Sequence, residues 1–451
     1  MDVRGLRCTV FGMGKSGLAT LELLRRRGAA ARASDTRPPE DWDAASAARL
    51  EACRAPFVIQ GPAAVEDVDL LILSPGVPPD QPLFAQARAA GVPVIGDVEF
   101  ASRFLRGRVL AITGSNGKTT TTALCGHLLS AAGLDVRVGG NIGTPLAAFV
   151  EDLADTSWTV LEMSSFQAEM LTTLRIHIGV ALNVTPDHLD RHATFERYAA
   201  AKARLFAFQQ AEDHAVLNYA DPVTAGFAAA TRARCHWFQT AGPLPAGFWL
   251  DNGILVADGA GWMPAAEIPL RGTHNIENVL AAGCAAHLAG VPLDAARRAV
   301  ASFPGVEHRL EFVRRLGGAE YYNDSKATNV DATIKALESF AGGLWVILGG
   351  KDKGSDYAPL APLLRERARG VLLIGAAAAK IRSHLEPALA GAVPLMDCGT
   401  LEAAVHAARE RARAGDTVLL APACASFDQF TSYEHRGQTF KQIVHALEGE
   451  P

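Results

Sequence analysis

Residues 109–122 read VLAITGSNGKTTTT, and this stretch decides the fold of the central part of the chain. Residues 109–113 form an apolar, partly β-branched run with the length of a buried strand. The glycine-rich segment Gly114–Gly117 follows at once, and a segment that can form a helix opens at Lys118. Strand, glycine loop and helix in this order are typical of a nucleotide-binding α/β domain.

This loop carries the groups that a triphosphate needs. Backbone amides and the helix dipole can surround the phosphates, Lys118 can neutralise the outer ones, and the Thr119 hydroxyl can bind Mg2+. Only two residues separate Gly114 from Gly117, fewer than in a Walker A motif, and a purely structural turn is the weaker alternative. The candidate ATP-binding residues here are Gly114, Ser115, Asn116, Gly117, Lys118, Thr119 and Thr120.

A second glycine-rich turn lies near the start of the chain. Gly12, Gly14 and Gly17 form a literal G-x-G-x-x-G after a short strand, and Asp35 ends the next strand. This spacing is typical of a dinucleotide site, although the glycines can also serve only a tight turn. An NAD-dependent dehydrogenase would leave the Gly114 loop without a role, so it is the remote alternative. A nucleotide-dependent switch or motor is disfavoured by the missing Walker spacing.

The alternation of strands and helices predicts an α/β fold with three consecutive domains. Strands are expected at residues 9–11, 32–34, 70–73, 109–113, 344–348, 371–374 and 418–421, with others near Thr159 and Ile178 and a long helix at 275–289. Boundaries near Gly96 and Gly305 give a Rossmann-like N-terminal domain (1–96), a central P-loop-type ATPase domain (97–305) and a Rossmann-like C-terminal domain (306–451).

The composition is that of a globular protein without a nucleic-acid or membrane surface. Of 451 residues, 49% are hydrophobic and 20% charged, and the net charge of −5 argues against broad binding of nucleic acid. The run Arg25–Arg27 is best explained as compensation of a helix dipole. Seven scattered cysteines without a CxxC pair, no long apolar run and no signal-like N-terminus predict a cytoplasmic protein with no membrane insertion.

Further motifs carry a resemblance to a known family. TGSNGKTTTT at 113–122 resembles the ATP-binding motif of the Mur ligase superfamily, which includes folylpolyglutamate synthase. Other matches are SDTR (34–37), SPG (74–76), GNIG (140–143), LEMSSFQ (161–167), NVTPDHLDRH (183–192), Lys202, GTHNIEN (272–278), HRLE (308–311), NDSKATN (323–329), LGGKDKG (348–354) and APACASFDQF (421–430). They cover essentially the whole chain, and NDSKATN and ACASFDQF resemble the D-glutamate-adding branch.

The resemblance implies an ATP-dependent carboxylate-amine ligase of peptidoglycan synthesis. Its substrates would be UDP-N-acetylmuramoyl-L-alanine and D-glutamate, joined through an acyl phosphate, and the enzyme would be a monomer. Such a reaction needs no enzyme nucleophile, so Mg2+ and cationic side chains should dominate the site. Another amino-acid ligase of the same superfamily is the nearest alternative.

The resemblance also implies a magnesium site built from Thr119, Glu162, His188 and Lys202, with Lys202 carbamylated. Glu162 and His188 follow expected strands, where open α/β sheets bind ligands. From the residues alone, Glu162 could be a solvated glutamate, His188 a hydrogen-bonded core histidine and Lys202 a surface lysine. Carbamylation requires a desolvated, partly neutral amine.

The remaining expected site residues also follow from the resemblance. Those expected to bind ATP are Asn278, Arg309 and Asp324. Those expected to bind the UDP substrate are Lys15, Ser16, Asp35, Thr36, Asn141 and Ser164. Those expected to bind D-glutamate are Lys326, Thr328, Lys353, Ser426 and Tyr433, the last replacing the phenylalanine of the family. A surface ion pair is the alternative for Arg309, and Lys351 is the alternative to Lys353.

Overall fold

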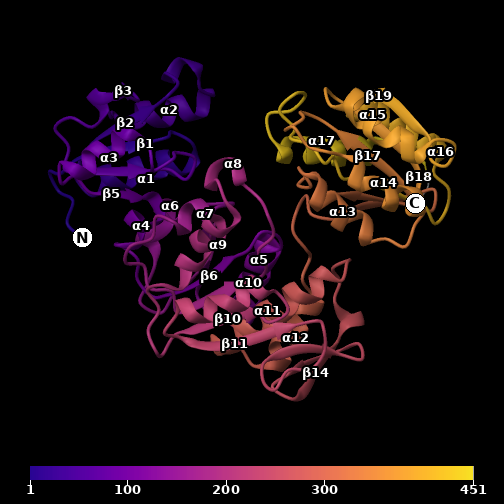
Figure 1. The fold of residues 1–451 in the computed structure, drawn as a ribbon, viewed down its shortest axis with the longest axis horizontal. Helices are drawn as coiled ribbons and strands as arrows, with labels where there is room; N and C mark the ends of the chain where they lie inside the picture. The colour runs from indigo at the N-terminus through magenta and orange to yellow at the C-terminus, as the bar shows by residue number, and fades with distance from the viewer. Residues whose placement is uncertain (450–451) are drawn as a thin grey trace. The chain divides into compact units, whose positions relative to one another are not determined.

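The computed structural model describes residues 1–449, with the backbone alone at position 190. The chain forms two compact units. The first comprises Met1–Glu267 and Glu277–Phe303, and the second comprises Ile268–Ile276 and the chain from Pro304 onward. The first unit contains two sheets and the second contains one (Figure 1).

The first sheet has five parallel strands in the order β3-β2-β1-β4-β5. The strands are β1 (Arg7–Phe11), β2 (Ala30–Asp35), β3 (Phe57–Ile59), β4 (Leu70–Leu73) and β5 (Val94–Gly96). The helices are α1 (Lys15–Arg26), α2 (Ala44–Cys53), α3 (Pro82–Ala89) and α4 (Asp97–Ser102). The strand order reverses between β1 and β4, and such a switch point opens a crevice at the carboxyl ends of the strands.

The second sheet has nine strands in the order β14-β13-β12-β11-β10-β9-β6-β8-β7. They are β6 (Arg108–Thr113), β7 (Val136–Gly140), β8 (Trp158–Glu162), β9 (Ile178–Ala181), β10 (His214–Asn218), β11 (Arg234–Gln239), β12 (Phe248–Asp251), β13 (Ile254–Ala257) and β14 (Ala260–Pro264). Its helices are α5 (Lys118–Ala131), α6 (Leu146–Phe149), α7 (Ser165–Ala168), α8 (Leu189–His192), α9 (Phe195–Ala203), α10 (Pro222–Gly226), α11 (His274–Leu288) and α12 (Leu293–Ala301). β6 lies between β8 and β9 with all three parallel, so their carboxyl ends share one edge.

The third sheet has six strands in the order β15-β16-β20-β17-β18-β19, of which only β15 is antiparallel to its neighbour. They are β15 (Glu311–Leu316), β16 (Ala319–Asn323), β17 (Leu344–Gly349), β18 (Ala368–Ile374), β19 (Leu395–Gly399) and β20 (Thr417–Leu420). The helices are α13 (Val330–Glu338), α14 (Ala361–Arg367), α15 (Ala378–Leu389), α16 (Leu401–Arg411) and α17 (Tyr433–Ala446).

The cores follow from strands that are apolar on both faces. Every residue of β4, β8 and β17 is buried, as expected for parallel strands covered by helices on both sides. The arginine run ends α1, where Arg26 and Arg27 both pair with Glu151, which agrees with the structural explanation of that run. Among the residues that the structure describes, none of the helices has the length and apolarity needed to span a membrane.

Candidate functional site

The loop between β6 and α5 is fixed by the segment that follows β9. The amide of Ser115 donates to the carbonyl of Asn183 (2.8 Å), and the amide of Asn116 donates to Asn183 Oδ1 (2.8 Å). Gly117 has a φ of 84°, and a Cβ there would collide with Oδ1 of Asn278. Asn278 is buried and accepts from Thr121 Oγ1 on α5 (3.2 Å), so it packs between the first turn of α5 and the loop. The expected phosphate loop is therefore a turn held by hydrogen bonds at the start of a helix.

Lys118 folds back over this loop. Its Nζ donates to the carbonyls of Gly114 (2.8 Å) and Ser115 (2.7 Å). The ammonium thus lies at the mouth of the turn, where phosphate oxygens would meet the loop amides.

Lys202 is not a surface lysine. Its side chain, on α9, is only 1% exposed, and Nζ donates to the same Gly114 carbonyl (2.8 Å). The Nζ atom lies 4.4 Å from the centroid of the Tyr198 ring. Burial, reinforced by the charge of Lys118, lowers the pKa of Lys202 to about 6. The amine is therefore mostly neutral at pH 7 and able to react as a nucleophile.

Glu162 is not a solvated glutamate either. It ends β8, is 1% exposed and accepts from Asn141 Nδ2 through Oε1 (3.1 Å). Its other oxygen, Oε2, is buried and has no hydrogen-bond partner among the residues described. A buried carboxylate oxygen without a partner is costly unless a cation completes its environment. Thr119, the second residue of α5, offers a further oxygen at the same edge of the sheet.

His188 lies in the loop after β9 in a left-handed conformation, with a φ of 51°. Its side chain is 49% exposed, lies 3.6 Å from Asp187 and meets the Phe166 ring edge-on at 5.0 Å. It is therefore not a core histidine. That description fits His192 instead, which is buried and hydrogen-bonded to Ser165 Oγ (2.9 Å).

The oxygen and nitrogen donors at this edge fit a hard divalent cation. Thr119, Glu162 and His188 come from segments that follow or end the neighbouring strands β6, β8 and β9. Magnesium prefers oxygen ligands and retains water, so a small, partly open set of donors suits it. Sequence reasoning did not identify Tyr198, whose hydroxyl lies 3.1 Å from Ser115 Oγ and whose ring covers Lys202. Only its position four residues before Lys202 on one helix could have indicated it.

A cavity of about 410 Å3 lies at the switch point of the first sheet. It is lined by Gly12, Met13, Gly14, Lys15, Ser16, Asp35, Thr36, Gln60, Ser74, Pro75, Gly76, Val77, Pro78 and Gln81. The structure thus brings four of the expected UDP-substrate residues together. Both oxygens of Asp35 are already engaged, accepting from the amides of Met13 (2.7 Å) and Arg37 (3.1 Å), so this carboxylate also holds two turns in place.

The other two expected UDP-substrate residues lie in the central domain. Asn141 contacts Glu162, and Ser164 caps α7 in a reciprocal arrangement with Gln167. A larger groove of about 590 Å3, at the opposite end of the first sheet, is lined by Arg7, Arg25, Arg32 and Arg54 among others. Arg25 and Arg54 lie where α1 and α2 end, Arg7 pairs with Asp69 (2.8 Å), and Arg32 donates to the Glu66 carbonyl (2.5 Å). These arginines already have structural roles, so we do not assign the groove to a substrate.

In the second unit, Asp324 is fully buried at the end of β16. Burial raises the pKa of its carboxyl to about 6. Arg309 Nη1 lies 3.8 Å from Asp324 Oδ1, and the Leu310 amide donates to the same oxygen (3.3 Å). The ion pair of Arg309 is therefore made with a buried acid, not with a surface one.

Four of the residues expected to bind D-glutamate lie on three loops of this unit, and the fifth, Tyr433, opens α17. Lys326 Nζ lies 5.7 Å from the Tyr433 ring centroid, and the Thr328 amide donates to the Lys326 carbonyl (2.9 Å). Ser426 is buried, whereas Lys353 is exposed. The Lys353 and Ser426 loops are joined by the Lys351 amide, which donates to the Ala425 carbonyl (2.8 Å).

Arg436 ties the Lys326 and Ser426 loops together, and sequence reasoning missed it. Its guanidinium is 1% exposed and donates to Oγ and O of Ser325 (2.9 and 2.8 Å) and to the Cys424 carbonyl (3.2 Å). Burial lowers its pKa to about 10. Its partner Ser325 lies 111 positions away in the sequence, so no local pattern could indicate the contact.

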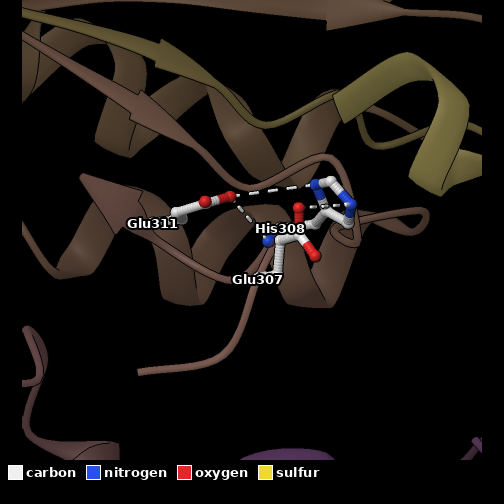
Figure 2. Close-up of side chains that lie close together, drawn as sticks. All are labelled: Glu307, His308 and Glu311. Carbon is white, nitrogen blue, oxygen red and sulfur yellow. Dashed lines mark hydrogen bonds and ion pairs between the residues drawn. The ribbon is translucent and has the colours of Figure 1, made fainter. Parts of the chain in front are cut away.

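Glu307, His308 and Glu311 also form a group that could hold a cation, with ligand atoms within 4.8 Å of one another (Figure 2). Lys441 already supplies the positive charge, because its Nζ lies 2.7 Å from Glu307 and 2.8 Å from Glu311. His308 Nδ1 lies 2.9 Å from Asn323 Nδ2, which ties it to β16. We therefore interpret this group as a structural ion network.

Comparisons with known proteins cover all three parts of the chain. A Mur ligase MurD-like N-terminal domain matches residues 6–96. A Mur ligase middle domain matches residues 112–286, and a Mur ligase glutamate ligase domain matches residues 308–424.

Curated relatives match over their whole length. The chain is 57% identical over 448 residues to UDP-N-acetylmuramoylalanine--D-glutamate ligase of Solibacter usitatus, covering 99% of both chains. It is 51% identical over 456 residues to the enzyme of the same name from Acidobacterium capsulatum, covering 100% of this chain and 98% of the relative.

Solved structures agree on the fold. A UDP-N-acetylmuramate-alanine ligase from Thermotoga maritima has a TM-score of 0.62 at 18% identity, covering 98% of this chain and 99% of that one. The MurF ligase of the same organism, solved in complex with ADP, has a TM-score of 0.58 at 18% identity, covering 98% and 96%.

Proposed function

The chain belongs to the Mur ligase family, and from this premise we propose how its residues divide the work of an acid-amine ligase. The reaction is the ATP-dependent ligation of D-glutamate to UDP-N-acetylmuramoyl-L-alanine, a step of peptidoglycan synthesis. The observation that carries it is identity of 57% to an enzyme of that name over 99% of both chains. We assign residues 1–96 to the UDP substrate, 97–305 to ATP and 306–451 to the amino acid.

The chemistry is two successive displacements. A carboxylate oxygen of the UDP substrate attacks the γ-phosphorus of ATP and ADP leaves, which gives an acyl phosphate. The amine nitrogen of D-glutamate then attacks the acyl carbon, phosphate leaves and the nitrogen loses a proton. Neither step uses a nucleophile of the enzyme, so alignment and charge neutralisation supply the catalysis.

In our assignment, the phosphate loop holds the triphosphate. Residues 114–120 surround its oxygens, with Lys118 supplying positive charge, and Asn278, Arg309 and Asp324 bind the nucleotide. Support comes from the Asn183 hydrogen bonds, which hold the loop amides in place, and from Lys118, which already lies over the loop. Because these hydrogen bonds hold the loop, it does not need to reorganise when charge develops.

In the same assignment, Thr119, Glu162, His188 and carbamylated Lys202 hold Mg2+. The ion, when bound, supplies positive charge that neutralises phosphate oxygens during transfer. The lone Oε2 of Glu162 and the neutral amine of Lys202 support this assignment. Lys202 would acquire its carboxylate by attack of the amine on carbon dioxide, which forms an N–C bond and releases one proton.

The UDP substrate is assigned mainly to the N-terminal domain and the amino acid to the C-terminal domain. Lys15, Ser16, Asp35 and Thr36 hold the uridine diphosphate, with Asn141 and Ser164 nearer the reacting carboxylate. Lys326, Thr328, Lys353 and Ser426 bind D-glutamate, and the Tyr433 ring covers it. Two lysines facing two carboxylates give the charge complementarity that a diacid requires. We further propose a cytoplasmic monomer without membrane insertion or nucleic-acid partners.

An amino-acid panel tests the proposal. ADP release should require UDP-N-acetylmuramoyl-L-alanine and Mg2+ and should be fastest with D-glutamate. The Lys118→Ala protein is the control and should release ADP at least about 100-fold more slowly. A preference for L-alanine or a diamino acid, or ATP turnover without the UDP substrate, would overturn the assignment.

A further inference from the structure

The loop that carries Lys353 also carries an acid directly beside it. Asp352 precedes Lys353, and an ionised aspartate at that position could pair with the lysine or repel a dicarboxylate substrate. Both effects would weaken a site whose ligand bears two negative charges. The structure shows a second cation that bears on this conflict.

Lys380, near the start of α15, forms an ion pair with the Asp352 carboxylate. Its Nζ lies 2.8 Å from Asp352 Oδ2 and 5.7 Å from the centroid of the Tyr357 ring. The Tyr357 hydroxyl donates to Asp352 Oδ1 (2.8 Å), and the Ser355 amide donates to the same oxygen (3.2 Å). These contacts hold the pKa of Asp352 down at about 2, with the Lys380 hydrogen bond as the largest cause.

Lys353 remains available. Its side chain is exposed, and it has no ion-pair partner among residues 1–449. The other acid of the loop, Asp356, lies beside His384 on the same helix, with His384 Nδ1 2.9 Å from Asp356 Oδ1. The same ring nitrogen accepts from the Tyr357 amide (3.2 Å), so this contact anchors the loop. Helix α15 thus contacts both acids of the loop and supplies the cation that pairs with Asp352, the acid next to Lys353.

The same network faces the Ser426 loop. The Tyr357 hydroxyl lies 3.0 Å from Cys424 Sγ, and both side chains are buried. The Lys351 amide donates to the Ala425 carbonyl. Lys353 and Ser426, both assigned to D-glutamate, therefore project from loops that are joined to each other.

We propose that Lys380 is a positioning residue for D-glutamate. Lys380 forms an ion pair with the Asp352 carboxylate, so that Lys353 can bind a carboxylate of the substrate. This inference rests on the proposed function of Lys353. The amino-acid site then depends on Lys380 although this residue does not contact the substrate, because Lys380 acts through Asp352.

Steady-state kinetics with Lys380→Met test this role. Methionine keeps an apolar stem against Tyr357 but removes the charge. We expect KM for D-glutamate to rise about fivefold, the size of effect expected from a partly exposed charge, with kcat and KM for ATP within about twofold. Raising the ionic strength to about 0.5 M should reduce this difference, since salt screens the freed carboxylate.

The double variant separates charge from architecture. If freed Asp352 causes the defect, Lys380→Met with Asp352→Asn should return KM for D-glutamate to within about twofold of wild type, and Asp352→Asn alone should also lie within about twofold. If the ion pair merely braces the loop, both single variants and the double variant should be equally impaired, and the inference is wrong.

A matched control lies on the same helix. Arg382 pairs with Asp397 at 2.8 Å, and Arg382→Met removes a cation about as exposed as Lys380 from an ion pair away from the Lys353 loop. It should leave KM for D-glutamate unchanged. An unchanged KM in Lys380→Met, with normal wild-type turnover, overturns this inference alone. Wild-type protein that shows no D-glutamate-dependent ADP release overturns the proposed function as well.

Discussion

The two glycine-rich turns of this chain, after β1 and after β6, share a strand, a turn and a helix but differ in the acid beside them. Both carboxylate oxygens of Asp35, beside the first turn, accept hydrogen bonds from the amides of Met13 and Arg37. Glu162, beside the second, keeps Oε2 buried without a hydrogen-bond partner in the described part of the chain. The same backbone motif therefore stands beside two different carboxylates: one braces its turn, and the other keeps an oxygen that we propose binds a cation.

A lysine lies near each turn, and the two lysines differ in burial. Lys15 is exposed beside the first turn, whereas Lys202 is buried against the second with a pKa of about 6. A glycine turn alone thus does not specify its ligand. We expect the charged side chains around the turn to specify the ligand. Changing these side chains one at a time should show that the two turns have different functions.

The largest effect is expected at Lys202. Lys202→Ala removes the side chain that we propose to be carbamylated, and ligation should fall by about 1,000-fold or more because a carboxylate is lost from the magnesium site. ADP release would be measured with and without a short carboxylic acid. The added acid should partly restore the rate.

The exposed Lys335, paired with Glu338, supplies the matched control. Lys335→Ala should keep its activity and show no response to the acid. Full activity of Lys202→Ala in plain buffer would show that the buried amine has no catalytic role.

A smaller loss is expected when only the charge of Glu162 is removed. Glu162→Gln can still accept from Asn141 but places a neutral amide at Oε2, so kcat should fall about 100-fold and the Mg2+ concentration needed for half-maximal rate should rise. Titration of ADP release with Mg2+ measures both. Glu212→Gln, at an exposed ion pair of the same domain, should behave as wild type. An unchanged Mg2+ requirement would remove Glu162 from the metal site.

Burial of Lys202 should also cost stability. Its ordinary pKa is 10.5, and in the folded protein it is about 6, so between these values the unfolded chain binds more protons. Stability therefore rises with pH across this window. Lys202→Met should raise the free energy of unfolding by roughly 4 kcal/mol at pH 7, and most of this gain should be lost by pH 10.

Urea unfolding in carbon dioxide-free buffer at both pH values measures this gain. Lys335→Met should show no comparable pH dependence, because Lys335 is exposed. A loss of stability in Lys202→Met at pH 7 would mean that the amine is well solvated or charged in the folded state.

Much of the fold could be read from the sequence. The strands β4, β6 and β17 were predicted because each is a largely apolar run, β1 was predicted at residues 9–11 from its place before the glycine-rich turn, and the three-domain α/β fold is confirmed. The strands β3 and β5 were missed because each has only three residues, too few for a recognisable period. The antiparallel extension β12–β14 was missed too, since its short strands are held mainly by pairing with one another.

The site was predictable only where chemistry is local in sequence. A phosphate loop is predicted from Gly114–Thr120 alone, and the structure shows the expected strand, turn and helix there. The burial of Lys202 could not be predicted, because its alanine neighbours fit an exposed helix as well as a buried one, and only the family resemblance indicated its role. Arg436 was missed because its contacts depend on how distant loops pack.

The smallest effect is expected at Asp35, and it completes the comparison of the two turns. Asp35→Asn keeps one acceptor oxygen but loses the charge and one of the two amide contacts, so the turn should loosen without losing a metal ligand. KM for the UDP substrate should rise about tenfold, with kcat and the Mg2+ requirement nearly unchanged. Glu51→Gln, an exposed acid on α2, should leave KM unaltered. A shift in the Mg2+ requirement of Asp35→Asn would mean that both turns act on the same ion, and the distinction between a bracing acid and a metal-binding acid would fail.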